Sequence, residues 1–198
     1  GVDLEIDKTY RYCVLSNRKK NYLGVTNSGK VDVKGLTGKK SHTPAFIKKL
    51  FFELLDVLSV VQTMEDFVKA KKEISEKIAI CGKKVEAKEI PLEDLTFNVM
   101  LSKSPSEYTK TIPQHIRAAK QLEGIREIKK GDKISFIKIL NKPGVKPVEL
   151  AKKEEIDSKK YMEFLESTLE QITSSMDLDF DTILGKPKQT GLDEFFWS

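Results

Sequence analysis

Apolar residues recur at steps of three and four positions between residues 47 and 61, and this pattern constrains the fold most strongly. The stripe consists of Ile47, Leu50, Phe51, Leu54, Leu55, Leu58 and Val61. One side of an α-helix repeats at these steps, so the segment predicts an amphipathic helix that faces a hydrophobic core. Pro44 suits the start of such a helix, and Thr43 suits its N-cap.

Two later segments also predict helices. Thr63 and Asp66 resemble a capping box, and the apolar stripe that follows is Phe67, Ala70, Ile74, Ile78 and Cys81. Asp157 or Ser158 can cap a last long helix, whose stripe is Tyr161, Phe164, Leu165, Thr168, Leu169 and Ile172. We expect this last helix to pack on the helix of residues 47–61.

Alternating apolar and polar residues predict strands in two regions of the chain. The first region has strands at 2–7 and 10–15 and a hairpin of 23–25 with 30–33, in which Asn27-Ser28-Gly29 forms the turn. The second region has a strand at 97–102 and a hairpin of 134–140 with 145–150. Together with the helices, these strands predict the α+β class.

Three carboxylates, Asp3, Glu5 and Asp7, alternate with apolar residues in the first predicted strand. Such a group could suggest a metal site, but one solvated strand face explains it better. Cys13 and Cys81 have no Cys or His nearby at a metal-ligand spacing, so no zinc site is expected. Both cysteines are predicted to be small buried groups.

The positive charge of the chain is concentrated at one end. The formal net charge of the 198 residues is +5, and residues 1–40 contain nine Lys or Arg against four Asp or Glu. The excess in this segment equals the whole net charge, which suggests a polyanionic partner there. No apolar run approaches the roughly 20 residues of a membrane helix, and the N-terminus has no signal-peptide layout, so a soluble cytoplasmic protein is expected.

Three cations and a phenol lie together in Arg18-Lys19-Lys20-Asn21-Tyr22. Lys and Arg neutralise phosphates whatever the base sequence, and an adjacent Tyr or Asn can reach a sugar or a groove edge. The stretch therefore predicts contact with a nucleic-acid backbone. On charge alone, a solvated basic hairpin end is an equal alternative.

Two other segments are candidate phosphate contacts. Lys39 and Lys40 lie in a glycine-containing loop ahead of the first long helix. Gln114 and His115 follow Tyr108 and precede a predicted short helix, where free backbone N–H groups suit a phosphate. Helix capping is an equal alternative for Gln114 and His115.

The segment Lys19-Lys20-Asn21-Tyr22, with the hairpin after it, resembles the KKxY element of archaeal family B DNA polymerases. The resemblance continues in order through residues 97–103, 111–115, 144–148 and the helix around Tyr161, so it covers nearly the whole chain. It implies that residues 1–36 are the last palm strands and that residues 37–184 are a mainly helical thumb with a small β-hairpin subdomain. Residues 185–198 are then a flexible tail.

The catalytic carboxylates of that family lie upstream of residue 1 in the aligned order. The resemblance therefore implies no catalytic residue and no metal ligand in this chain, and it places Mg²⁺ on a separate large catalytic chain. The chain is either a fragment of such a polymerase or, as we expect, the small polypeptide of a split one, in the nucleoid of a prokaryote. It would grip the primer–template duplex through Arg18, Lys19, Lys20, Asn21, Tyr22, Lys39, Lys40, Gln114 and His115.

The last ten residues contain the pattern QxxLxxFF, formed by Gln189, Leu192, Phe195 and Phe196. In a helical turn this spacing puts Leu192 and the two Phe residues on one side. The pattern resembles the clamp-binding peptide of proteins that dock on the sliding clamp PCNA, in which the apolar residues fill a pocket and the Gln binds the clamp surface. A tail folded back onto its own domain is the alternative.

A non-enzymatic DNA-binding adaptor recruited to PCNA is the alternative function. It needs the same basic hairpin and tail but no polymerase partner. An independent hydrolase or nuclease has little support, because the sequence contains no P-loop, nucleophile elbow or metal-ligand spacing.

Overall fold

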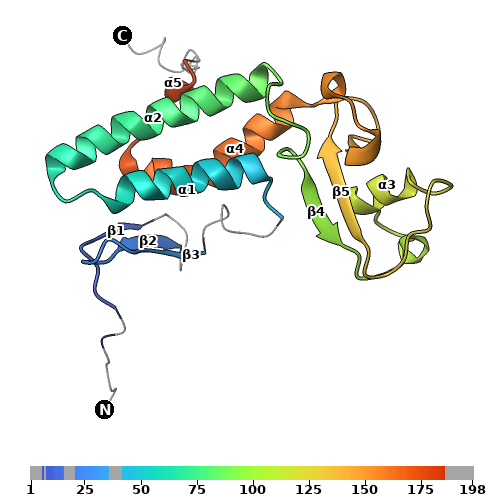
Figure 1. Ribbon diagram of the computed structural model, residues 1–198, viewed down its shortest axis with the longest axis horizontal. Coiled ribbons are helices and arrows are strands. Elements are labelled where there is room, and N and C mark those ends of the chain that lie inside the picture. Colours follow the sequence, from blue (N-terminus) through green and yellow to red (C-terminus); the bar gives the residue numbers. More distant parts are fainter. Residues whose placement is uncertain (1–5, 7, 16–20, 36–41, 186–198) are drawn as a thin grey trace, which may run out of the picture. The chain divides into compact units, whose positions relative to one another are not determined.

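The computed structural model describes residues 6, 8–15, 21–35 and 42–185 (Figure 1). These residues form two three-stranded antiparallel sheets together with α-helices, so the predicted α+β class is confirmed. The chain divides into two compact units. The first unit comprises Gly1–Gly35, Leu54–Lys83 and Leu169–Ser198, and the second comprises Leu36–Glu53 and Lys84–Thr168. The domain boundaries expected from the sequence, 1–36, 37–184 and 185–198, stay a prediction.

The sheet of the first unit has the strand order β1 (Tyr12–Leu15), β2 (Tyr22–Val25) and β3 (Val31–Lys34). The predicted hairpin between β2 and β3 is confirmed. Its turn is closed by Thr26, whose N–H donates to the Lys30 carbonyl at 3.0 Å and whose carbonyl accepts from Gly29 at 2.9 Å. Gly29 has a φ of 82°, which only glycine adopts without strain. The strand expected at 2–7 lies outside the described residues except for Ile6.

The two faces of this sheet differ in burial. Val14, Leu23 and Val25 are buried, and the Tyr12 hydroxyl on the same face donates to the Leu58 carbonyl of α1 (Ala45–Ser59). We call the opposite side the outward face; by the strand register it carries Cys13, Leu15, Tyr22, Gly24, Asp32 and Lys34. Cys13 is exposed, and Cys81 is half-buried, so the prediction that both cysteines are buried was wrong. Cys13 alternates with buried Val14 in the same strand, which places it on the outward face.

The three long helices follow their predicted stripes. They are α1, α2 (Met64–Glu86) and α4 (Ser158–Thr173). Buried stripe residues include Ile47, Phe51, Leu54 and Leu58 of α1, Ile74 and Ile78 of α2, and Tyr161, Leu165, Leu169 and Ile172 of α4. The predicted capping box of α2 is present: the Thr63 hydroxyl accepts from the Asp66 N–H, and the Asp66 carboxylate accepts from the Thr63 N–H, both at 3.1 Å.

The expected packing of the last helix on the first is confirmed within the second unit. The rings of Phe46 in α1 and Tyr161 in α4 meet edge to face, with centroids 6.1 Å apart. Phe46 is buried, and Tyr161 is fully buried. An aromatic contact of this geometry adds to the stabilisation that burial provides.

The sheet of the second unit has the order β4 (Phe97–Met100), β5 (Lys133–Lys138) and β6 (Val145–Pro147). The Phe97 and Phe136 rings stack across β4 and β5 at 5.6 Å. β6 is shorter than the predicted strand at 145–150, because a 3₁₀ turn (Val148–Leu150) follows it. Pro147 explains the difference: it has no N–H to donate, so it ends the ladder.

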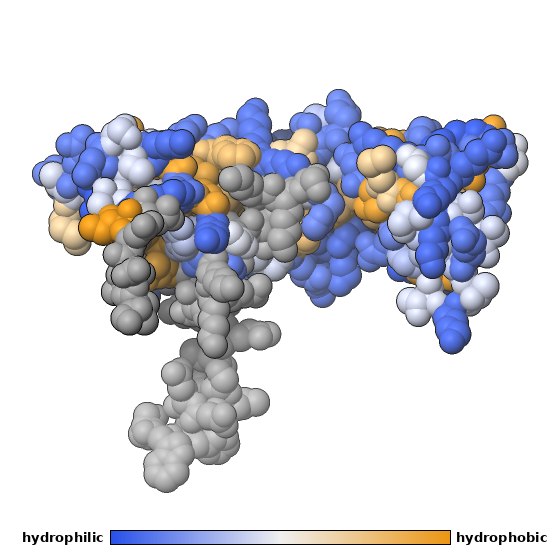
Figure 2. All heavy atoms as spheres, turned by 90° about the horizontal axis from the view of Figure 1, so that it is seen from below, coloured by the Kyte–Doolittle hydropathy of each residue, from blue (hydrophilic) through white to orange (hydrophobic). Residues whose placement is uncertain are grey.

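The remaining helical segments are short. They are α3 (Gln114–Lys120), α5 (Phe180–Ile183) and 3₁₀ turns at Pro105–Glu107, Lys153–Glu155 and Ser174–Met176. Within the described residues, no helix combines the length and the apolar character needed to cross a membrane. Polar and charged residues make up most of the surface visible in Figure 2, with smaller apolar areas between them.

Candidate nucleic-acid interface

Four of the predicted DNA-binding residues are described by the structure: Asn21, Tyr22, Gln114 and His115. Asn21 and Tyr22 belong to the first unit, and Gln114 and His115 belong to the second. The other predicted contacts lie outside the described residues; they are Arg18, Lys19, Lys20, Lys39 and Lys40. The predicted clamp-binding residues Gln189, Leu192, Phe195 and Phe196 also lie outside them.

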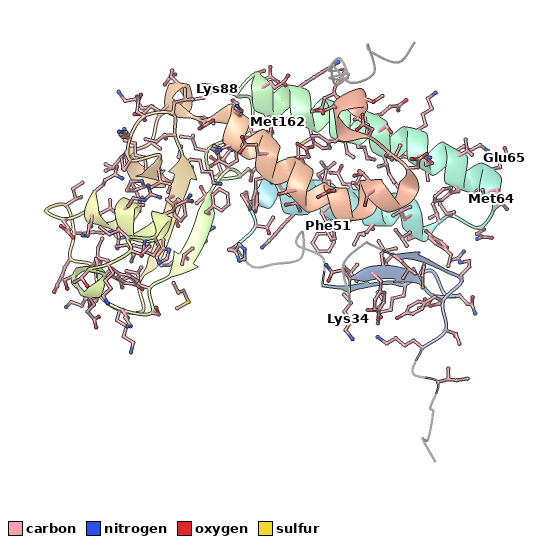
Figure 3. The ribbon with its side chains drawn as sticks, turned by 180° about the vertical axis from the view of Figure 1, so that it is seen from behind. Lys34, Phe51, Met64, Glu65, Lys88 and Met162 are labelled. Carbon is pink, nitrogen blue, oxygen red and sulfur yellow. The ribbon has the colours of Figure 1, made fainter. Side chains whose placement is uncertain are left out.

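Tyr22 is the first residue of β2 and lies on the outward face of its sheet. The register pairs it with Leu15 on one side and Lys34 on the other. Leu15 is 68% exposed, Lys34 is exposed, and the Lys34 side chain projects from the sheet in Figure 3. Tyr22 therefore lies on an accessible sheet surface, and in the sequence only Asn21 separates it from the basic segment of residues 18–20.

The Tyr22 hydroxyl takes part in a chain of polar contacts on the outward face. It lies 3.4 Å from the Tyr10 hydroxyl. The Tyr10 hydroxyl donates to the Asp32 carboxylate at 2.7 Å, and the Lys8 ammonium donates to the same carboxylate oxygen at 2.8 Å. The Tyr10 and Tyr22 rings also meet edge to face at 6.0 Å. We call Lys8, Tyr10, Tyr22 and Asp32 the tyrosine relay.

A bend in the backbone brings Tyr10 to this face. Strict alternation would place Tyr10 on the same side as Tyr12 and Val14, but Arg11 lies at a bend before β1. The Arg11 N–H donates to the Val25 carbonyl at 2.7 Å, and its guanidinium donates to the carbonyls of Thr26 and Ser59 at 3.3 and 3.4 Å. These three bonds fix the bend.

Gly24 provides the space into which the Tyr10 ring fits. A Cβ atom at Gly24 would lie 2.4 Å from two carbons of the Tyr10 ring, a distance that real Cβ atoms do not show. Any larger residue would therefore displace the ring from the sheet. Gly24 pairs with Asp32 across β2 and β3. The Tyr10 ring therefore lies over β2 at Gly24, and its hydroxyl reaches the Asp32 carboxylate of β3.

The polar contacts favour the protonated form of Tyr10. Its pKa is raised above the ordinary value of 10.0, first by the hydrogen bond with Tyr22 and then by that with Asp32. Tyr10 is therefore a neutral hydroxyl at physiological pH, and its proton is available to Asp32. The sequence interpretation did not identify Tyr10 or Asp32 as site residues; the one signal was a glycine in the middle of β2, which often marks close approach of another group.

The second predicted pair lies at the start of α3. Gln114 is the first residue of this helix and is exposed, and Pro113 occupies the N-cap position. The His115 ring meets the Tyr108 ring edge to face at 6.2 Å, and the Tyr108 hydroxyl lies 3.2 Å from the Ser102 hydroxyl. Neither Gln114 nor His115 is therefore the N-cap residue of α3. This excludes the alternative that one of them caps the helix from the N-cap position.

Partial burial lowers the pKa of His115. The neutral imidazole is therefore favoured at physiological pH, and it offers one donor and one acceptor rather than a positive charge. Arg117 of the same helix donates to the Pro143 carbonyl at 2.9 Å, and Gln121 donates to the Val145 carbonyl at 2.9 Å. These two bonds hold α3 against the β5–β6 hairpin.

A two-metal polymerase site needs carboxylates close together. Among residues 6, 8–15, 21–35 and 42–185, no three or more His, Cys, Asp or Glu side chains are arranged so that they could hold a metal ion. The residues that the structure describes therefore do not fit a magnesium site. The expectation that Mg²⁺ binds to another chain stays a prediction.

Comparison with known proteins identifies relatives along nearly the whole chain. The chain is 41% identical to "DNA polymerase 1" of Sulfolobus acidocaldarius over 200 residues, which is 100% of this chain and 22% of that protein. It is 38% identical to "DNA polymerase 1" of Aeropyrum pernix over 189 residues, which is 95% of this chain and 20% of the relative. The chain thus spans about a fifth of the length of these curated relatives.

A solved structure has the same fold. The family B DNA polymerase from the hyperthermophilic archaeon Pyrobaculum calidifontis superposes with a TM-score of 0.61, at 18% identity, over 87% of this chain and 21% of that one. A family model described as "DNA polymerase family B" matches residues 1–181. The resemblance predicted from the KKxY segment is confirmed, and the chain belongs to DNA polymerase family B.

Proposed function

We propose that this chain holds the primer–template duplex in a family B DNA polymerase, as the end of the palm and the thumb. The family match supports this function over a non-enzymatic adaptor. The observation that carries the proposal is the outward face of the β1–β3 sheet, on which Tyr22 and Lys34 are cross-strand partners. Tyr22 follows the basic segment Arg18-Lys19-Lys20 with only Asn21 between them. In this proposal the cations neutralise backbone phosphates, and Tyr22 braces the sugar or the minor groove.

The polymerase chemistry belongs to carboxylates outside these 198 residues. The matched region is only 22% of the Sulfolobus acidocaldarius protein and 20% of the Aeropyrum pernix protein, so most of each relative lies outside it. We propose that the rest of the polymerase supplies the metal-binding acids, on a separate large chain. Co-purification tests this: a stable complex with a chain that carries polymerase catalytic motifs is expected, and recovery of the sliding clamp alone would favour the adaptor.

Removing two cations tests the duplex grip. In the polymerase that contains this chain, Lys19→Ala with Lys20→Ala should weaken primer–template binding. It should also lower the slope of log affinity against log salt by about two units, because each lost phosphate contact removes roughly one. The measurement is a binding titration at several salt concentrations.

A matched control separates this contact from general charge. Lys83 and Lys84 are adjacent, exposed residues of α2, so replacing both by Ala removes the same charge elsewhere. This control should leave the slope nearly unchanged. Equal slopes for both double variants, or a wild-type slope for the Lys19 and Lys20 variant, would rule out the phosphate role.

A further inference from the structure

Which hydroxyl donates each hydrogen bond in the tyrosine relay determines whether Tyr22 can act as a donor or an acceptor toward a ligand. A phenol has one proton to donate, and Tyr10 donates its proton to Asp32. The 3.4 Å contact between the two hydroxyls allows either one to donate by its geometry. Since the Tyr10 proton goes to Asp32, we infer that Tyr22 is the donor in this contact and Tyr10 the acceptor. The Tyr22 oxygen keeps only acceptor capacity toward the outside.

This proton order gives Tyr22 a different chemistry from Lys19 and Lys20, which precede it in the sequence. Phosphate oxygens accept hydrogen bonds and do not donate them, so a Tyr22 hydroxyl committed to Tyr10 has no proton for a phosphate. The guanine amino group is the one donor that base pairs present in the minor groove, and it suits an acceptor. Phosphate contact thus falls to the cations, and Tyr22 is left to meet a donor.

We propose that Tyr10, held by Asp32 and Lys8, is a positioning residue that fixes the Tyr22 ring and directs its hydroxyl as a hydrogen-bond acceptor toward the duplex. The inference rests on the function proposed above and deepens it. Three independent features support it: the hydroxyl contacts, the edge-to-face ring contact at 6.0 Å, and the absence of a Cβ at Gly24, which makes room for the Tyr10 ring.

A double-mutant cycle tests whether Tyr10 acts through Tyr22. Tyr10→Phe keeps the ring over Gly24 and removes only the hydroxyl, and Tyr22→Phe removes the ligand-facing hydroxyl. Each single variant of the polymerase should bind primer–template about threefold to tenfold more weakly, the range of one hydrogen bond. In the Tyr22→Phe background, Tyr10→Phe should cost nothing more, since the group that it positions is already absent.

Salt dependence and a matched control complete the experiment. Neither Phe variant should change the salt slope, in contrast to the Lys19 and Lys20 variant, because no phosphate contact is lost. Tyr12→Phe removes a hydroxyl from β1 on the buried side of the same sheet, where it donates to the Leu58 carbonyl. It should lower the thermal midpoint without weakening DNA binding.

The possible failures are distinguishable. If Tyr10→Phe costs as much in the Tyr22→Phe background as in the wild type, or if it lowers the salt slope, or if it leaves affinity unchanged, the positioning role is wrong. If Tyr22→Phe and the Lys19 and Lys20 variant both bind DNA like the wild type, the proposed duplex grip itself fails.

Discussion

At Tyr161 a single hydroxyl completes two backbone hydrogen bonds inside the second unit. It donates to the Leu95 carbonyl at 2.7 Å and accepts from the Lys138 N–H at 3.0 Å. Burial is the main cause that raises the pKa of this phenol above its ordinary value of 10.0, so it remains a neutral donor. The ring packs on Phe46 and Phe97. One residue thus joins α4 to β5 and to the segment before β4.

Tyr161→Phe should lower the free energy of unfolding of the chain by about 1–3 kcal/mol. The ring is kept, but the buried Leu95 carbonyl and the part-buried Lys138 N–H lose their partner. A buried polar group left without a partner costs its desolvation penalty. Urea denaturation measures the change. Tyr108→Phe is the control, because its hydroxyl contact with Ser102 is exposed; equal effects of the two variants would contradict the argument.

At the scale of elements, the short strand β6 is secured by an ion pair. The Lys146 ammonium of β6 donates to both carboxylate oxygens of Glu155, at 2.7 and 3.0 Å. The same carboxylate accepts from the Lys152 N–H at 2.9 Å. Glu155 closes the 3₁₀ turn ahead of α4, so this pair links that turn to a strand that Pro147 cuts short.

Glu155→Gln should lower stability at neutral pH and have little effect in acid. The hydrogen bond from Lys146, and then that from the Lys152 backbone, lower the pKa of Glu155 below its ordinary value of 4.5. The contribution to stability is therefore complete above pH 4.5 and is lost as pH falls through the lowered folded pKa. Thermal midpoints of both proteins from pH 7 down to pH 3 measure the effect.

The neighbouring carboxylate supplies the control for this pH profile. Glu154 is exposed, and Glu154→Gln removes the same charge without the Lys146 ion pair. Its difference from the wild type should be small at every pH. A Glu155→Gln defect that stays constant from pH 7 to pH 3 would exclude the ion pair as its source.

At the scale of the whole molecule, the proposed function joins a duplex grip to a clamp tether. The QxxLxxFF residues Gln189, Leu192, Phe195 and Phe196 follow the last described helix, α5, along the chain. A tethered polymerase has a high effective concentration at the primer end, so a weak peptide can raise processivity greatly. This tether is a proposal that the motif alone supports.

Deleting residues 189–198 should abolish the stimulation of synthesis by the clamp and leave clamp-free synthesis intact. The physical reason is that the tether adds effective concentration without changing the catalytic step. Primer extension with and without PCNA measures both activities. Replacing Lys186 and Lys188 by Ala changes the linker but keeps the motif, so it should preserve stimulation. A parallel loss of both activities on deletion would show a structural tail.

Local sequence patterns determined the helices and strands of this protein, because helix and strand periodicities depend on residues that are close in the sequence. The stripe from Ile47 to Leu58 and the Gly29 turn predicted α1 and the β2–β3 hairpin correctly. The KKxY segment indicated the family, and Tyr22 was found with it. The end of β6 at Pro147 was readable in principle, since proline cannot donate to a ladder.

Only the tertiary structure decided the surroundings of Tyr22. Alternation would put Tyr10 on the buried side of its strand, but the bend at Arg11, fixed by carbonyls as distant as Ser59, turns it to the outward face. Asp32 reaches the same hydroxyl from another strand. Contacts of this kind depend on long-range backbone geometry, which sequence periodicity does not contain, and this is why the tyrosine relay became visible only in the folded chain.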